Sequence, residues 1–229
     1  MRSLILVAGG TGTRMNRPVA KQFLPLGDRP VIVHTLGRFR EAYPDLHVVL
    51  VLHESLHPAW EEVVKAHPEA RVECVVNGGE ERFHSVLNGL RALPEGAGWV
   101  GIHDAVRPFV EVETIQRCYN AAAAHGGAIP VVPVKDTIRQ VGEQGSDPLD
   151  RATLRGVQTP QVFSLPQLRA AYGVEYQSWF TDDASVWEAA GNTLTLVDGD
   201  LHNIKITTPE DLLSAEAFLS LRTASDGRA

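Results

Sequence analysis

Glycines and positively charged residues lie close together near the start of the chain. An aliphatic run at residues 4–8 ends in the sequence GGTG, and three cations come within the next nine residues: Arg14, Arg17 and Lys21. Aliphatic residues bounded by glycines are typical of a buried strand followed by a sharp turn. Glycines let an anion approach the backbone N–H groups because they carry no Cβ. With cations beside it, this turn is predicted to bind the phosphates of a nucleoside triphosphate.

Two other kinds of phosphate-binding loop also follow a first strand, and both are disfavoured. The dinucleotide-binding fingerprint needs a third glycine three residues after the second, and here that position after Gly12 is Met15. The lysine-containing P-loop ends in Gly-Lys-Ser or Gly-Lys-Thr, and the sequence contains neither triplet. Cations within the loop itself favour phosphoryl transfer, because charge develops on the phosphate during that reaction.

Aliphatic runs and amphipathic stretches alternate along most of the chain. We expect strands at 4–8, 47–52, 71–76, 99–102 and 127–132, and helices at 30–40, 56–67, 82–92 and 112–125. Because the strands are almost continuously apolar, they predict an α/β sandwich with a mostly parallel sheet. Ligands of such sheets bind at the carboxyl ends of the strands. The glycine turn and the pair His103-Asp104, which ends the fourth strand, both fall at this edge.

Residues at about 133–160 break this alternation. Two extended pieces, at 137–141 and 152–157, flank the polar sequence GEQGSDP, which predicts a projecting β-hairpin arm. An isolated two-stranded hairpin is marginal in water, so a second subunit is expected to pack against it. Beyond the arm we expect a helix at 166–176, a short helix after Thr181, a strand at 193–197 and a final helix starting at Thr208.

Length and composition limit the classes of protein. A chain of 229 residues favours one compact domain, 1–229, with the arm as an excursion. Its formal net charge of −7 argues against a nucleic-acid partner or an anionic membrane surface. Cys74 and Cys118 match neither a disulfide framework nor a zinc site, which fits a reducing cytosol. We find no export signal and no stretch long enough to span a membrane, so we expect a cytoplasmic protein.

Six blocks of sequence together carry a family resemblance. They are LVAGGTGTRM with the following Lys-Gln pair, GGEERFHSV, HDAVRP, TPQ, TDDAS and NIKIT. In this order, from Leu4 to about Leu212, they resemble the 2-C-methyl-D-erythritol 4-phosphate cytidylyltransferase family of sugar-phosphate nucleotidylyltransferases. The resemblance implies a three-layer Rossmann-like nucleotidyltransferase fold. It also implies transfer of a cytidylyl group from CTP to methylerythritol phosphate, with release of pyrophosphate, in non-mevalonate isoprenoid biosynthesis.

Four cations match residues that this family uses for catalysis. Arg14 and Lys21 match the pair that stabilises the transition state at the α-phosphate, and Arg151 and Lys205 match residues that hold the incoming phosphosugar. The attacking phosphate monoester has a second pKa of roughly 6, so at neutral pH it is largely ionised and needs no general base. Catalysis then depends on positioning and on cations that support the crowded α-phosphate.

The resemblance also implies residues for each substrate. Those expected to bind the nucleotide are Ala8, Gly9, Gly10, Gly12, Gly79, Glu80, Ser85 and Asp104. Those expected to bind the acceptor are Asp104, Arg107, Thr137, Thr159 and Thr181. His103 is expected to be a structural hydrogen-bonding group. Mg²⁺ is expected to be held mainly by the CTP phosphates, and no protein ligand is assigned to it.

In the family the arm is exchanged across a two-fold dimer, so we expect a homodimer in which each acceptor site borrows residues from its partner. Two alternatives stay open. One is a related cytidylyltransferase that uses ribitol 5-phosphate, since both acceptors are short polyol phosphates. The other is a non-catalytic nucleotide-binding regulator. The presence of Arg14, Lys21, Arg151 and Lys205 together argues against the regulator, because binding alone needs no support at the α-phosphate.

Overall fold

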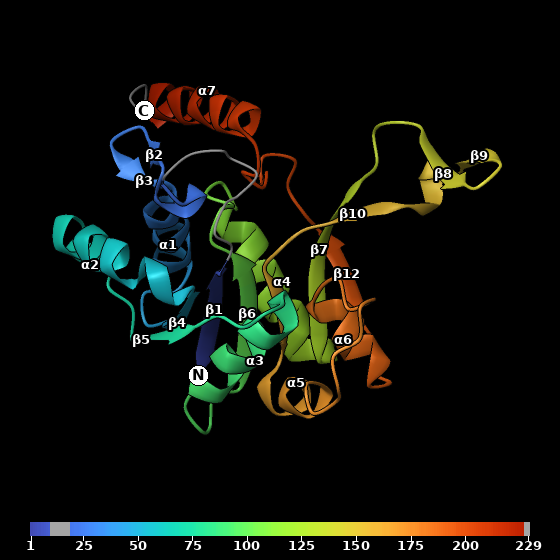
Figure 1. The fold of residues 1–229 in the computed structure, drawn as a ribbon, viewed down its shortest axis with the longest axis horizontal. Coiled ribbons are helices and arrows are strands. Elements are labelled where there is room, and N and C mark those ends of the chain that lie inside the picture. Colours follow the sequence, from blue (N-terminus) through green and yellow to red (C-terminus); the bar gives the residue numbers. More distant parts are fainter. Residues whose placement is uncertain (10–18, 227–229) are drawn as a thin grey trace.

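A computed structural model describes residues 1–9 and 19–226 of the chain (Figure 1). Within this part, eight strands form one mixed sheet whose main path runs in the order β10-β7-β11-β6-β1-β4-β5, with β12 paired to β7. The strands of this sheet are β1 (Arg2–Ala8), β4 (His47–Leu52), β5 (Cys74–Asn77), β6 (Trp99–Asp104), β7 (Gly127–Pro133), β10 (Arg155–Val157), β11 (Gln161–Ser164) and β12 (Thr195–Asp198). Neighbouring strands from β6 to β5 are parallel, which confirms the predicted mostly parallel α/β sheet.

Successive residues of the central strands supply cores on opposite faces of the sheet. Leu4 and Leu6 of β1 pack into one cluster, and Ile5 packs into the other. Helices cover both faces, so the molecule has three layers. The helices are α1 (Val31–Ala42), α2 (His57–Ala66), α3 (Arg82–Ala92), α4 (Val112–His125), α5 (Leu165–Ala171), α6 (Asp183–Ala189) and α7 (Pro209–Asp226). α1, α2 and α4 pack against the first cluster, and α3, α5 and α6 against the second.

The amphipathic pattern explains how individual helices pack. In α4, Ile115, Cys118, Tyr119 and Ala122 recur at helical spacing, and all four are buried against the sheet. The final helix begins where the sequence predicts: the Asp211 carboxylate accepts the N–H groups of Thr207 and Thr208, which caps its first turn. No helix in the described part of the chain is long and apolar enough to cross a membrane.

Short elements connect the main ones. β2 (Pro25–Leu26) and β3 (Arg29–Pro30) form a small ribbon against α7, as Figure 1 shows. Single turns of 3₁₀ helix occur at η2 (Lys21–Phe23), η3 (Glu54–Leu56), η4 (Pro68–Ala70) and η5 (Arg151–Thr153). Pro30 is the N-cap of α1 rather than part of its first turn, because its extended backbone precedes the helix.

The arm exists, but its second strand differs from the prediction. β8 (Ile138–Gly142) pairs with β9 (Gly145–Leu149), so only residues 143–144 of the polar segment form the turn and most of the rest lies in β9. The expected second piece at 152–157 instead gives η5 and β10, and β10 pairs with β7 in the main sheet. The hairpin residues are almost all exposed, so no apolar alternation marked the strand. Gly145, at φ 147°, provides the backbone conformation that closes the tight turn.

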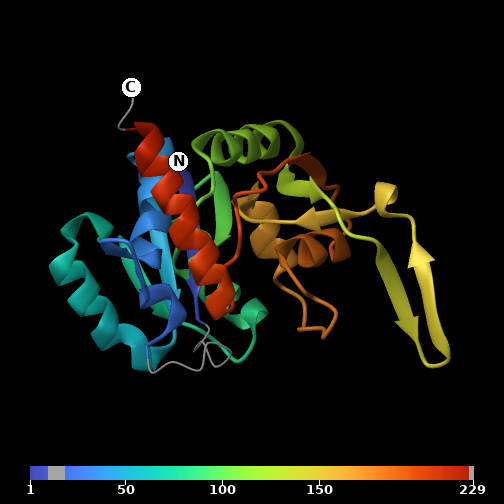
Figure 2. The same ribbon diagram turned by 90° about the horizontal axis from the view of Figure 1, so that it is seen from above.

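Both views show the hairpin of β8 and β9 standing away from the helices and the sheet (Figures 1 and 2). Three further differences concern elements of the main body. β11, which runs antiparallel between β6 and β7, was not expected. α5 ends at Ala171, earlier than predicted, and β5 begins only at Cys74.

Candidate active site

Two glycine-rich turns meet at the carboxyl ends of β1 and β5. The Ser85 hydroxyl accepts a hydrogen bond from the Gly79 N–H at 3.0 Å. A Cβ on Gly9 would lie 3.4 Å from the same oxygen, and one on Gly78 would lie 3.2 Å from it. Ser85 is buried in the first turn of α3, so it fixes both turns to one helix. We call Gly9, Gly78, Gly79 and Ser85 the glycine corner.

The glycine corner includes several residues that were predicted to bind the nucleotide. Ala8 ends β1, and its carbonyl accepts a hydrogen bond from the Gln22 side chain at 2.9 Å. This contact places η2, which carries Lys21, beside the end of β1. Glu80 is exposed at the mouth of the corner. Three predicted residues lie outside the described part of the chain: Gly10, Gly12 and Arg14.

A cavity of 280 Å³ lies beside this corner. Its charged and hydroxyl-bearing lining includes Arg82, Asp104, Arg107, Thr159, Thr181 and Lys205. Asp104 ends β6 and pairs in register with Val7 of β1. Arg82 and Ser85 lie three residues apart in the first turn of α3, so this turn borders the cavity and the corner together. We call this space the cation-lined cavity.

Asp104 holds the cations of the cavity in place. Its Oδ2 atom lies 3.1 Å from Arg107 Nε and 3.1 Å from Lys205 Nζ. Burial raises the pKa of Asp104, but Lys205, Arg82 and Arg107 lower it by more, so the pKa is held well below its usual range. Asp104 is therefore ionised at neutral pH.

Arg107 and Lys205 differ in how much of their charge faces the cavity. Besides its bond to Asp104, the Arg107 guanidinium donates to the Asn203 carbonyl at 2.8 Å, and only 11% of its side chain is exposed. Lys205 is 40% exposed. Lys205 thus offers its ammonium to a ligand, whereas much of Arg107 serves to bind the end of β6 to the segment before α7.

His103 has the structural role predicted for it. The Thr159 hydroxyl accepts the Asp104 N–H, which leaves its hydrogen for His103 Nδ1 at 3.0 Å. The other ring nitrogen lies 3.3 Å from the Arg107 carbonyl and carries the ring proton. Burial lowers the pKa of His103 to about 3, so the ring is neutral at pH 7. Its buried nitrogens are engaged within the protein, and it has no role as a proton acceptor for a ligand.

The structure thus brings together most of the described residues that were predicted to form the site. Thr159 and Thr181 line the cavity with Asp104, Arg107 and Lys205. Thr137 and Arg151 are not among its lining residues; both are exposed at the base of the arm, where Arg151 donates to the Lys135 carbonyl. Within one chain, the structure does not join these two residues to the cavity.

Several lining residues of the cavity were not predicted from the sequence, and Arg82 is the cation among them. Arg82 is the first residue of α3 and donates to Asp183 Oδ2 at 2.6 Å. Asp183 is fully buried, and its other oxygen accepts the Tyr172 hydroxyl at 2.7 Å. The partner stands 101 residues away in sequence. Arg82 belongs to the block GGEERFHSV, from which only Gly79, Glu80 and Ser85 were assigned to a substrate. Membership of that block was the only local signal for Arg82.

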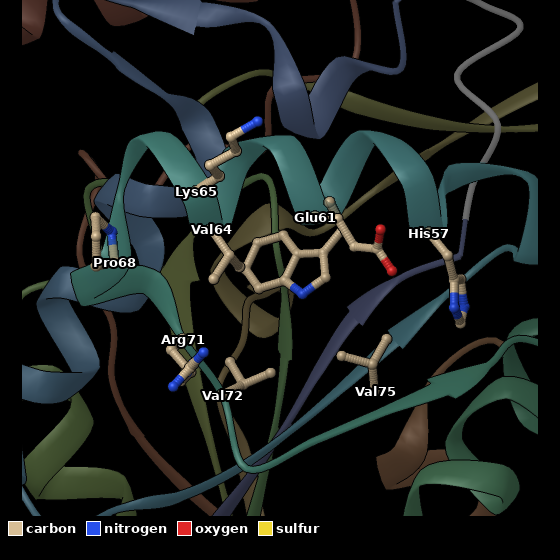
Figure 3. A pocket seen from close by; sticks show the side chains of 9 residues that line it. His57, Glu61, Val64, Lys65, Pro68, Arg71, Val72 and Val75 are labelled. Atoms are coloured by element: carbon tan, nitrogen blue, oxygen red, sulfur yellow. The ribbon is translucent and has the colours of Figure 1, made fainter.

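A larger hollow, of 640 Å³, lies between α2 and the edge strand β5 (Figure 3). Trp60, Val64, Val72 and Val75 give it an apolar lining, with Glu61 and Arg71 at its margin. None of the predicted site residues lines it. Its position away from the parallel strands' carboxyl ends separates it from the cation-lined cavity.

A parallel α/β sheet with a glycine corner and a cation-lined cavity at the carboxyl ends of its strands defines a nucleotide-binding protein that handles phosphate. The family model of 2-C-methyl-D-erythritol 4-phosphate cytidylyltransferase matches residues 3–221. The chain belongs to this family.

Curated relatives and solved structures agree with the family match. The 2-C-methyl-D-erythritol 4-phosphate cytidylyltransferase of Bacteroides thetaiotaomicron is 48% identical, over 95% of this chain and 99% of its own. The enzyme of that name from Geobacillus kaustophilus is 44% identical, over 96% and 97%. The fold resembles crystal structures of 4-diphosphocytidyl-2C-methyl-D-erythritol synthase from Anaerococcus prevotii and of 2-C-methyl-D-erythritol 4-phosphate cytidylyltransferase from Thermus thermophilus. The first has a TM-score of 0.82, 28% identity and 96% coverage of each chain; the second has a TM-score of 0.75, 32% identity and coverages of 94% and 98%.

Proposed function

We propose that this chain transfers a cytidylyl group from CTP to 2-C-methyl-D-erythritol 4-phosphate, giving 4-diphosphocytidyl-2-C-methyl-D-erythritol and pyrophosphate. The family model matches nearly the whole chain, and relatives of this name are 44–48% identical to the chain over almost their full lengths. The observation that carries the proposal is the placement of the cation-lined cavity directly beside the glycine corner, across the first turn of α3. This arrangement suits two anionic substrates that must meet.

The reaction joins an oxygen of the acceptor's phosphate to the α-phosphorus of CTP. The bond from that phosphorus to the bridging oxygen of the β-phosphate breaks, and pyrophosphate leaves with the electron pair. The acceptor's phosphate has a second pKa of roughly 6 and is its own nucleophile, so no proton needs to be removed at neutral pH. The neutral, internally bonded state of His103 is consistent with a reaction without a general base.

The protein's contribution is positioning and charge. Lys205 would bind the acceptor's phosphate, and Asp104 would hold Lys205 and Arg107 at a fixed separation as the anion enters. Arg14 and Lys21 are proposed to stabilise the negative charge that builds up at the α-phosphate. The glycine corner would receive the cytosine, because its lack of side chains leaves room for a ring and the Ser85 hydroxyl and nearby backbone groups can bond to it.

The chemistry of the site fits a Mg²⁺ ion carried mainly by the CTP phosphates. Asp104 is ionised, and its Oδ2 atom is taken by the two cations, so Oδ1 is the oxygen that would bind the ion or a water in its shell. The ion would neutralise part of the triphosphate's charge. In the described part of the chain, no group of three or more His, Cys, Asp or Glu side chains is arranged to hold a metal.

The protein is proposed to act as a homodimer that exchanges its arms. Thr137 and Arg151 are exposed at the arm base and away from their own chain's cavity, and the hairpin itself has almost no buried surface. A partner subunit gives the arm something to pack against and gives Arg151 an acceptor phosphate to bind.

The proposed location is the cytoplasm. The two free cysteines, one buried and one half-buried, fit its reducing environment.

Subunit mixing tests the exchange. An Arg14→Ala subunit paired with an Arg151→Ala subunit keeps both intact residues at one of the two shared sites, so activity should return to about one working site per heterodimer. Two preparations of Arg14→Ala mixed together serve as the control and should stay inactive. No recovery in the heterodimer would mean that each site is complete within one chain.

Pyrophosphate release tests the activity itself. The purified chain is assayed with CTP, UTP and ATP, each with methylerythritol phosphate and with ribitol 5-phosphate. Rapid release with CTP and methylerythritol phosphate is expected. Turnover with ribitol 5-phosphate alone would replace the acceptor, and release with no pair of substrates would favour a non-catalytic nucleotide-binding regulator.

A further inference from the structure

Arg82 lines the cation-lined cavity together with Arg107 and Lys205, but it comes from a different element of the fold. It belongs to α3, whereas Arg107 follows β6 and Lys205 precedes α7. Its position close to Asp104 is seen in the effect of its charge, which lowers the pKa of that carboxyl together with Lys205 and Arg107, against the effect of burial. The cavity is therefore lined by cations from three separate segments of the chain.

The Arg82 guanidinium is held in place from behind. Its Nη2 atom donates to Asp183 Oδ2 at 2.6 Å, and the Tyr172 hydroxyl donates to Asp183 Oδ1 at 2.7 Å. Asp183 has no exposed surface, and it opens α6 immediately after Asp182. The Tyr172 bond holds the Asp183 carboxylate in place, and this carboxylate in turn holds one nitrogen of the Arg82 guanidinium by a charge-assisted hydrogen bond.

The remaining donors of Arg82 are available to a ligand. In the described part of the chain its guanidinium donates to Asp183 alone, although an arginine carries five N–H donors. Its side chain is 28% exposed, against 11% for Arg107, and it lines the cavity. Arg107 has two of its guanidinium nitrogens bonded within the protein. Arg82 therefore presents more unused N–H groups to the cavity than Arg107 does.

The charged groups of the cavity indicate which class of ligand the unused N–H groups of Arg82 would bind. Arg82, Arg107 and Lys205 face the carboxylates of Asp104, Asp182 and Asp183. Asp182 accepts the Gln161 side chain and the Ser185 N–H, so it too is occupied within the fold. Ionised N–H donors that are fixed in direction and not saturated by carboxylates bind phosphate oxygens well.

On the basis of the proposed function, we propose that Arg82 is a further substrate-binding residue, which binds a phosphate oxygen of the acceptor in the cavity that it shares with Lys205. Asp183 and Tyr172 are positioning residues that aim it. The triphosphate of CTP is the other candidate ligand of Arg82, because its oxygens accept the same hydrogen bonds. Arg82 is assigned to the acceptor because the residues beside it in the cavity, Thr159, Thr181 and Lys205, are those of the acceptor side.

Steady-state kinetics with each substrate varied in turn separates the two sources. Arg82→Lys keeps the charge that faces Asp183 but loses the second arm of the guanidinium. It should raise the KM for the acceptor about tenfold, a loss equivalent to one charge-assisted hydrogen bond, and leave the KM for CTP within about twofold. Arg82→Met combined with Asp183→Asn removes the cation without leaving a buried carboxylate unpaired, and should raise the acceptor KM further.

Arg169→Lys is the matched control. Arg169 binds the Leu90 and Leu93 carbonyls at the other end of α3, outside the cavity. Arg169→Lys weakens contacts of the same helix without changing a residue of the cavity. Both KM values should therefore stay within about twofold. Thermal unfolding of every variant shows which of them is folded under the assay conditions.

Calorimetric titration with methylerythritol phosphate, and separately with CTP, measures the same contrast without turnover. Weaker acceptor binding in the Arg82 variants, with CTP binding kept, supports the inference. Weaker CTP binding alone, an equal loss for both ligands, or no loss for either would overturn it. A wild-type chain that binds the acceptor through Arg82 but releases no pyrophosphate would instead contradict the proposed function, so the two failures are distinguishable.

Discussion

The Asp104 carboxylate should stabilise the fold as well as the site, and Asp104→Asn measures by how much. Asp104 and Arg107 are about equally buried, at 10% and 11% exposure, and they form a charge-assisted bond worth roughly 1.5–3 kcal/mol. The Lys205 bond adds less, roughly 0.5 kcal/mol, because Lys205 is 40% exposed and its charge is screened by water. Together these give a loss of about 2–3.5 kcal/mol in the free energy of unfolding at pH 7.

For a chain of this length, that loss corresponds to a fall of about 5–10 °C in Tm. Urea unfolding followed by the fluorescence of the four tryptophans measures the free energy directly. Asp28→Asn is the control, because Asp28 is 81% exposed and its contact with Arg29 is 3.7 Å long. Its effect should stay within about 0.5 kcal/mol.

The pH dependence identifies the charge as the cause. The pKa of Asp104 is held well below its usual range in the folded protein, whereas the unfolded carboxyl has a pKa of about 3.9. The stability from its charge is therefore fully present above about pH 5 and is lost as pH falls below about 4. The difference between wild type and Asp104→Asn should be constant at pH 6–8 and shrink toward pH 3. Equal stabilities at pH 7, or a difference that grows on acidification, would refute the role given to Asp104.

Three further predictions concern the substrates. Gly79→Ala places a Cβ 2.4 Å from the Cβ of His84, so it should distort the glycine corner. The KM for CTP should rise at least tenfold, and the KM for the acceptor should change much less. Equal effects on both KM values would contradict nucleotide binding at the glycine corner. The kcat/KM for the acceptor should rise through about pH 6, the second pKa of the acceptor's phosphate, and then stay level. The level part is expected because the pKa of His103 is about 3, so His103 does not titrate at neutral pH. A protein group that titrates between pH 7 and 8 would contradict this prediction. Lys205→Met should raise the acceptor KM by more than tenfold in steady-state assays, and an unchanged KM would remove Lys205 from the acceptor site.

The central sheet could be predicted from sequence because its strands are buried on both faces. The run at 47–52 is aliphatic almost throughout and corresponds residue for residue to β4. Helices α3 and α4 were also predicted with their observed bounds, because each carries apolar residues at helical spacing against the sheet. Asp104 was found through the same pattern: it follows a buried strand, and polar residues at such ends collect at one edge of a parallel sheet.

The arm and Arg82 show where this reasoning stops. β9 pairs with β8, but all five of its residues are exposed, so they gave no periodic apolar signal. β10 and β11 are short, and their pairing with β7 and β6 depends on contacts across the sheet rather than on local pattern. Arg82 was missed because its orientation comes from Asp183, on a helix that packs beside α3 only in the folded chain.

The central claim is that the acceptor's phosphate displaces pyrophosphate at the α-phosphorus of CTP. Phosphorus NMR of the chain incubated with CTP, methylerythritol phosphate and Mg²⁺ follows every phosphate at once. The account predicts that the monoester signal and the triphosphate signals decline together, replaced in equal amounts by a diphosphate diester and by pyrophosphate. Formation of CMP and pyrophosphate with the monoester unchanged, or phosphate transfer that yields CDP, would contradict it.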